Sequence, residues 1–117
     1  MSESEIKGTH IISDEVIATI VLSAAAEASG IYLPSAGLAE RFGKKQSTKG
    51  IRIDQEEEGV AIEMKVAADY GINIPEACKA LQEKVAEKVT ALTGKNVLAV
   101  NIQVTDINTD NYESEQA

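Results

Sequence analysis

The fold of this chain is decided by one stretch, Asp69-Tyr70-Gly71-Ile72-Asn73-Ile74-Pro75, together with the helix and the strand that follow it. Asn73 has the position of a helix N-cap, and Glu76 three residues later gives the spacing of a capping box. Pro75 stands in the first turn, where its missing N–H costs no intrahelical hydrogen bond. Leu92-Thr93-Gly94 ends the helix with a glycine just past its last turn. The stretch therefore predicts a strand end, a capped helix and a second strand in succession.

Strict alternation of apolar and other residues marks the strands on either side of this helix. Residues 60–69 alternate over ten positions, and residues 97–104 follow the same pattern. Such a strand has one buried face and one wetter face. Ile51 and Ile53 begin a further alternating strand, and residues 55–59, which hold three adjacent glutamates, are predicted to form a hairpin turn.

A first helix is predicted to begin after Ser13, which has the character of an N-cap and precedes two acidic residues of the first turn. Gly30 is expected to stop this helix. Apolar residues recur at three- and four-residue spacing, which gives the helix one apolar face. These residues are Val16, Ile17, Ile20, Val21, Ala24 and Ala28.

The remaining segments complete the expected fold. Residues 8–12 are predicted to form a short extended segment, and residues 31–50 a long loop with one or two helical turns near residues 36–42. The order is then a short β segment followed by α, β, β, α and β. This order predicts an α+β two-layer sandwich, with two helices on one face of a small mixed sheet. Residues 1–5 are expected to be frayed, 6–107 to form a single domain, and 108–117 to be a polar acidic tail.

Charge is unevenly distributed along the chain. The net charge of −8, from 19 acidic and 11 basic residues, argues against a broad polyanion-binding surface. Residues 41–52 nevertheless contain five bases and no acid. This basic cluster is either a solvated loop or a docking patch for an acidic partner or an anionic membrane surface. Its members are Arg41, Lys44, Lys45, Lys49 and Arg52.

No catalytic, cofactor-binding or metal-binding residue is identified. His10 and Cys78 are the strongest candidates for nucleophilic chemistry, but His10 precedes the first helix and Cys78 lies on the apolar stripe of the second, which continues to Leu92. A single cysteine excludes an intramolecular disulfide, and one histidine with one cysteine excludes a metal cage built from these two types. Residues 106–117 have the first ligand spacing of a calcium loop, but Asn111 and Ala117 replace its essential glycine and glutamate.

Neither a membrane span nor a signal peptide is expected. Residues 16–26 are mostly apolar, but a stretch of eleven residues is too short to cross a bilayer. Four acidic residues precede the stretch, where a secretory signal carries positive charge. The single cysteine is compatible with a reducing cytoplasm.

Taken together, these motifs resemble the alkaline shock protein family, the cell-envelope stress-response proteins of Gram-positive bacteria. The resemblance covers about residues 6–107 and rests on the order and spacing of several short segments. These are Gly8, Ile11-Ile12-Ser13, Val16-Ile17, the alanine-rich helix ending at Gly30, Lys49-Gly50-Ile51, the stretch quoted first, Leu92-Thr93-Gly94, Val97, Val100-Asn101-Ile102 and Val104.

The resemblance implies a non-enzymatic, mostly cytoplasmic protein of cell-envelope homeostasis and stress. Some members of the family are held at the membrane by a small membrane protein carrying a related domain, and some self-assemble. The family has no established catalytic residues. We therefore expect an interaction or scaffolding protein that acts through the basic cluster, through an exposed sheet edge, or through both.

Two other functions remain as alternatives. The α-β-β-α-β order is also that of a KH-like nucleic-acid-binding module, although the acidic net charge, the missing GxxG loop and the few aromatic residues weigh against nucleic acid as a partner. A small-molecule enzyme would require a pocket lined by Asp, Glu or Tyr, and no sequence pattern indicates one.

Overall fold

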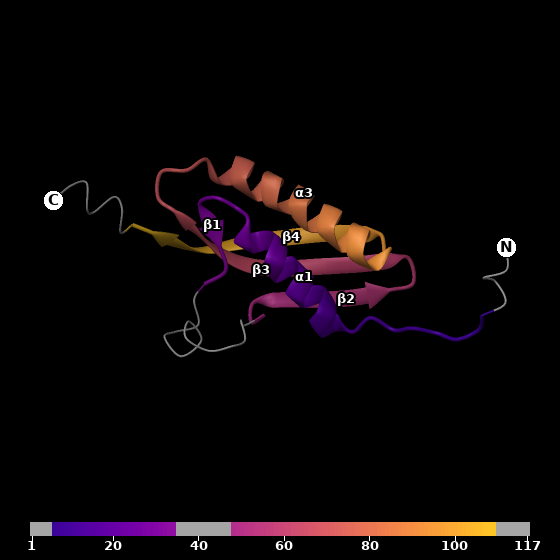
Figure 1. Ribbon diagram of the computed structural model, residues 1–117. Coiled ribbons are helices and arrows are strands. Elements are labelled where there is room, and N and C mark those ends of the chain that lie inside the picture. Colours follow the sequence, from indigo (N-terminus) through magenta and orange to yellow (C-terminus); the bar gives the residue numbers. More distant parts are fainter. Residues whose placement is uncertain (1–5, 35–47, 110–117) are drawn as a thin grey trace.

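The computed structural model describes residues 6–34 and 48–109 and has two layers. Figure 1 shows both helices on one face of a single sheet. The mixed sheet and the two helices confirm the predicted α+β class. The elements are α1 (Asp14–Ala26), β1 (Ile31–Tyr32), β2 (Ile51–Glu56), β3 (Gly59–Asp69), α3 (Ile74–Thr93) and β4 (Val97–Asn108).

Strand β3 is the centre of the sheet. Strand β2 pairs antiparallel with its first half through the tight turn at Glu57 and Glu58. The two residues of β1 pair antiparallel with Ala67 and Ala68, at the other end of β3. Strand β4 runs parallel to β3 along almost its whole length. Because a strand has only two edges, β1 and β2 share one edge of β3, and β4 occupies the other.

The core lies between the sheet and the two helices. Helix α1 packs over β2, α3 packs over β4, and the helices contact each other. Every buried side chain among the described residues is apolar. The largest fully buried side chains are those of Ile17, Ile31, Ile62, Met64, Leu81, Val21, Val60, Val66, Val85 and Val89.

The predicted N-caps of both helices and the glycine that ends α3 are confirmed, but α1 ends at Ala26 with Glu27 as its C-cap, before the predicted stop at Gly30. The Ser13 hydroxyl oxygen accepts a hydrogen bond from the Val16 N–H at 3.3 Å. The Asn73 side-chain oxygen accepts one from the Glu76 N–H at 3.1 Å. At the far end of α3, Gly94 has a φ of 75°, and its N–H donates to the Thr90 carbonyl at 2.9 Å. Local sequence therefore fixes where the helices begin and where α3 ends.

Three predictions about strands are wrong. Residues 8–12 form no strand, and the short strand β1 lies after α1, in the segment predicted as a loop. A two-residue strand shows no periodicity, so alternation could not reveal it. Strand β4 continues past residue 104 to Asn108, the first residue of the predicted tail. A register shift between Val66 and Ala67 hides this continuation, because the extra residue Thr105 breaks the alternation in β4.

Two residues predicted on apolar helix faces are exposed. Val16 is 49% exposed in the first turn of α1, and Leu92 is 67% exposed in the last turn of α3. Both lie at helix ends, where the helix has less of the sheet to pack against. The helical turns predicted near residues 36–42 lie outside the described residues.

Candidate functional site

The basic cluster is placed only in part. Arg41, Lys44 and Lys45 lie outside the described residues. Lys49 is exposed in the turn before β2, and Arg52 is on β2 itself. The Arg52 side chain is 70% exposed, and its Nε lies 3.9 Å from a carboxylate oxygen of Asp54. An exposed pair at this distance contributes little to stability, so the Arg52 guanidinium is available to other anions.

The face of the sheet opposite the helices carries polar side chains in rows across the strands. Successive side chains of a strand point to opposite faces, and the buried Ile53, Ile62 and Met64 face the helices. Arg52, Glu63 and Asn101 therefore form one row on the helix-free face, as their pairing in the sheet shows.

The next row on this face contains a gap. Lys65 pairs with Gln103 on β4. On the other side of Lys65 lies Gly50, whose carbonyl oxygen accepts the Lys65 N–H at 2.9 Å and which has no side chain. A hollow of about 530 Å³ opens there, lined by both rows. Of its ionisable side chains two are basic and one is acidic, so it is slightly positive on an otherwise acidic chain.

The outer edge of β4 is the second candidate surface. The Val60 N–H donates to the Asn96 carbonyl at 2.8 Å, and the Lys65 N–H donates to Gly50 across the other edge. Even-numbered residues of β3 therefore direct their backbone groups toward β4. With the observed register, the backbone N–H and carbonyl groups of Asn101 and Gln103 point toward β3. The same groups of three other residues of β4 point away from the sheet. These are Val100, Ile102 and Val104.

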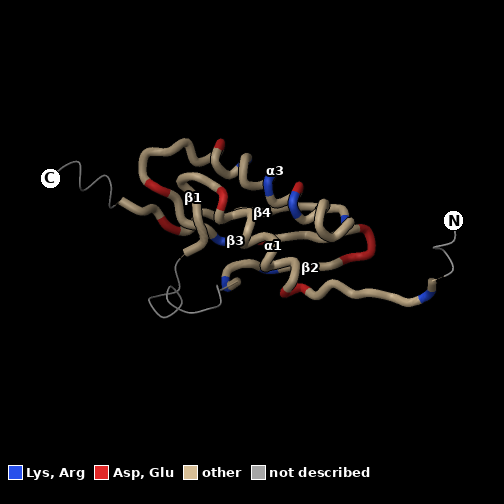
Figure 2. Tube along the Cα trace, viewed as in Figure 1, with Lys and Arg blue, Asp and Glu red and all other residues tan. Residues whose placement is uncertain are grey.

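Between its two register irregularities, this edge lacks the charged residues and prolines that usually protect an edge from strand pairing. Residues 97–105 contain no charged residue, no proline and no glycine, and Figure 2 shows this part of β4 in tan. No other strand in the described part of the chain pairs with this edge. The Val100 carbonyl accepts a hydrogen bond from Gln82 Nε2 at 3.0 Å. Long, uncharged edge strands pair readily with further strands.

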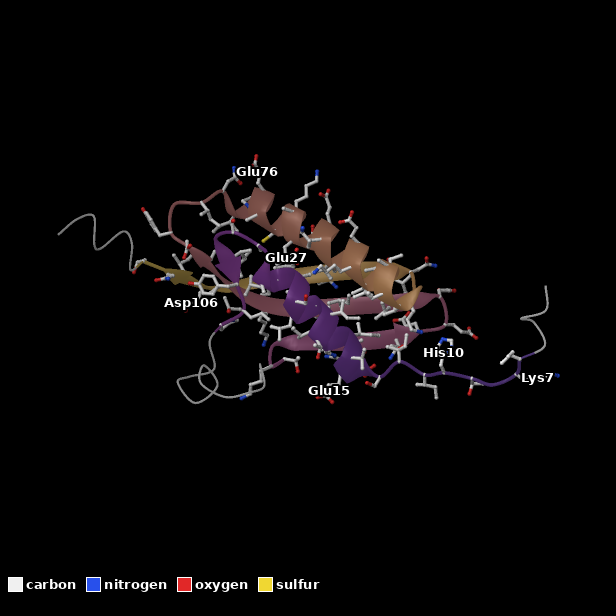
Figure 3. All side chains as sticks on the ribbon, viewed as in Figure 1. Lys7, His10, Glu15, Glu27, Glu76 and Asp106 are labelled. Carbon is white, nitrogen blue, oxygen red and sulfur yellow. The ribbon has the colours of Figure 1, made fainter. Side chains whose placement is uncertain are left out.

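An ion-pair cluster joins the two helices on the other face. Glu27, the C-cap of α1, accepts a hydrogen bond from Lys88 Nζ at 2.6 Å, and its carboxylate lies 3.3 Å from Lys84 Nζ. Figure 3 shows Glu27 between α1 and α3. The hydrogen bonds from Lys88 and then Lys84 hold the pKa of the Glu27 carboxyl below its ordinary value. The cluster therefore links the helices most strongly when Glu27 is ionised.

The stability that the ion pairs of Glu27 contribute depends on pH. Because the pKa of Glu27 is lower in the folded state, its stabilising contribution is complete above the unfolded pKa. It is lost as the pH falls through the folded pKa. We expect the side-chain carboxyl ¹³C signal of Glu27 to titrate at a lower pH in the wild type than in Lys88→Met. Identical midpoints would show that Lys88 does not hold the carboxylate in solution.

The two residues considered for nucleophilic chemistry differ in their exposure. Burial raises the pKa of the half-buried Cys78 thiol, which lowers its thiolate fraction at neutral pH. His10 is exposed on the segment before α1 (Figure 3). Within residues 6–34 and 48–109, no cluster of three or more His, Cys, Asp or Glu side chains could hold a metal ion. In the same ranges, neither helix is both long enough and apolar enough to cross a membrane.

Comparison with known proteins gives a family match over most of the chain. A family model described as the alkaline shock protein 23 family, with a cell envelope-related function, matches residues 2–109. The chain is similar to two Bacillus subtilis (strain 168) proteins. YqhY is 29% identical over 115 residues, which cover 92% of this chain and 85% of YqhY. YloU is 33% identical over 106 residues, which cover 86% of this chain and 88% of YloU.

A more distant relative has a name that refers to stress. The stress response regulator gls24 homolog of Streptococcus pyogenes serotype M1 is 27% identical over 119 aligned positions. The match covers 97% of this chain but 66% of that protein. No solved structure matches the chain.

Proposed function

This chain belongs to the alkaline shock protein 23 family, which its motifs resemble and whose function is cell envelope-related, and from that premise we propose that it is a non-enzymatic scaffold. It acts by protein–protein association near the cytoplasmic membrane. The observation that carries the proposal is the outer edge of β4, with its outward-facing backbone groups and its uncharged sequence.

Strand addition gives such an edge a direct way to bind. A partner strand supplies main-chain hydrogen bonds to Ile102 and Val104, and side chains on alternate positions decide which partner fits. A partner that carries a related domain has a matching edge of its own. A small membrane protein with such a domain would hold this chain at the membrane without a membrane-spanning segment in the chain itself.

The helix-free face supports the same proposal. A strand added beside β4 extends this face, so that its side chains lie next to Asn101 and Gln103. Lys65 lies on β3, one strand in from β4, and Arg52 lies on β2, two strands in. Both can contact acidic groups of a partner that reaches across this face. These contacts are exposed and weak one by one, so they select a partner more than they strengthen its binding.

A proline in the outer edge tests the proposal. Val104→Pro removes an N–H that faces away from β3, so the β3/β4 hydrogen bonds remain. We expect the variant to recover at least tenfold less of its protein partner in a pull-down from the native host with membranes retained. Val104→Ala is the matched control, because it also shortens the side chain but keeps the N–H, and it should recover as much partner as the wild type.

Two results would contradict the proposal. Equal recovery by Val104→Pro and Val104→Ala, with both variants folded by circular dichroism, would show that strand addition at this edge is not the mode of binding. Recovery of RNA with no protein partner would favour the KH-like alternative, since nothing in strand addition predicts retention of nucleic acid.

A further inference from the structure

We infer that the outer edge of β4 binds the same edge of a second copy of this chain, in an antiparallel pair centred on Ile102. The inference rests on the proposed function, because it requires that this edge accepts a strand, and it adds the identity and register of that strand. The resulting dimer has twofold symmetry and one continuous sheet, and a partner with a related domain binds this edge only by displacing the second copy.

The register follows from the backbone directions and the two irregularities of β4. Leu98 and Thr105 are the extra residues at the register shifts, so the regular part of the strand spans residues 99–104. Within it, the outward-facing residues are Val100, Ile102 and Val104. A twofold axis at Ile102 pairs Val100 with Val104 of the second copy, and Ile102 with its own equivalent. Each outward-facing N–H and carbonyl of the three then finds a partner.

The side chains are self-complementary in this register on both faces of the sheet. On the helix side, half-buried Val100, Ile102 and Val104 meet apolar residues of the second copy and complete their burial. On the helix-free face, Asn101 lies opposite Gln103 of the second copy, and Gln103 lies opposite Asn101. Two carboxamides can each donate and accept a hydrogen bond, so this pairing is satisfied in both directions.

Charge also favours a second copy at this place. Two copies of a chain with a net charge of −8 repel each other over most of their surfaces. Residues 97–105 contain no charge, so they form a strip where two copies can approach without contact between like charges. Asp106 follows directly at the end of this strip, and Figure 3 shows it at the far end of β4.

One contact of the single chain has to give way. The Val100 carbonyl accepts from Gln82 Nε2 in the present structure, and in the dimer it accepts from the Val104 N–H of the second copy. Gln82 lies on α3, and its side chain can turn outward to water. The exchange replaces one hydrogen bond with another, so it opposes dimer formation only weakly.

Charge substitutions at Asn101 and Gln103 test both the occupant and the register. In Asn101→Lys/Gln103→Lys and in Asn101→Glu/Gln103→Glu, like charges face each other twice across the axis. We expect the dimer dissociation constant of both variants to rise at least tenfold, measured by sedimentation equilibrium on the full chain. In Asn101→Lys/Gln103→Glu and in the reverse combination, opposite charges face each other, and the dimer should persist.

The reverse combination separates dimer contacts from effects within one chain. In Asn101→Glu/Gln103→Lys, the new charges repel Glu63 and Lys65 of their own sheet but attract the second copy. A lower melting temperature with an intact dimer is therefore expected. Loss of the dimer in both opposite-charge variants would overturn the register.

A monomeric wild type, or like-charge variants that associate as well as the wild type, would overturn the inference. The proposed function would survive a monomeric wild type if Val104→Pro still loses its partner in the pull-down. The proposed function would fail separately if the dimer forms and Val104→Pro still recovers as much protein partner as Val104→Ala.

Discussion

Replacing Gly59 with alanine is expected to lower the free energy of unfolding by about 3 kcal/mol, since a buried close contact cannot relax. A Cβ atom at this position would clash with the carbonyl oxygen of Asn96 and would lie 3.0 Å from Cγ of Leu98. The carbonyl cannot simply move away, because it accepts the hydrogen bond from the Val60 N–H that begins the β3/β4 pairing. Urea denaturation followed by circular dichroism measures the loss.

Gly94→Ala provides the matched control for this prediction. Gly94 has a φ of 75°, which disfavours alanine, but no atom beyond its two chain neighbours lies within 4 Å of the Cβ that alanine would add. Only the backbone conformation is penalised, by about 1 kcal/mol. Equal losses for the two variants would show that the contact with Asn96 is not what restricts position 59.

Gly59 also bears on the candidate interaction edge. The close approach of Gly59 to Asn96 and Leu98 fixes the point at which β4 joins β3, and the extra residue Leu98 follows at once. This start decides which residues of β4 face outward. If the β3/β4 register shifted by one residue, the backbone groups of Asn101 and Gln103 would point outward, and those of Ile102 and its outward-facing neighbours would point toward β3. The glycine therefore sets the chemistry of an edge on which it does not itself lie.

The parts of the fold that the sequence predicts are those with a local cause. The alternation in residues 60–69, the caps at Ser13 and Asn73 and the glycine after α3 each act over a few residues, and all are found in the structure. The errors occur where tertiary contacts decide. Strand β1 has two residues and exists only because it pairs with the end of β3, and Leu92 is exposed because α3 runs past its packing partners.

The candidate site was less accessible to sequence reasoning because its residues come together across strands. Lys49 and Arg52 stand out as part of a run of bases, whereas Lys65 and Gln103 are single polar residues in separate strands. Alternation placed both on a wetter face, but only the strand order brings them next to Gly50 and Arg52. The edge position of β4 also follows from strand order, which no local pattern contains.

Replacing Ile62 with alanine is expected to lower the free energy of unfolding by about 3 kcal/mol, because the truncation removes most of a fully buried aliphatic side chain. Ile62 is 0% exposed in the middle of β3, and the core residues of both helices lie above it. The truncation removes apolar contacts and leaves a cavity that a sheet covered by two helices cannot collapse. Chemical denaturation of the purified variant gives the value.

Glu63→Ala should change the free energy of unfolding by less than about 0.5 kcal/mol, although Glu63 is the next residue of the same strand. Glu63 lies on the helix-free face and is exposed. The two neighbours occupy opposite faces of β3, so the contrast reflects how one-sided the covering of the sheet is. A large loss for Glu63→Ala would mean that this face is packed against something in solution.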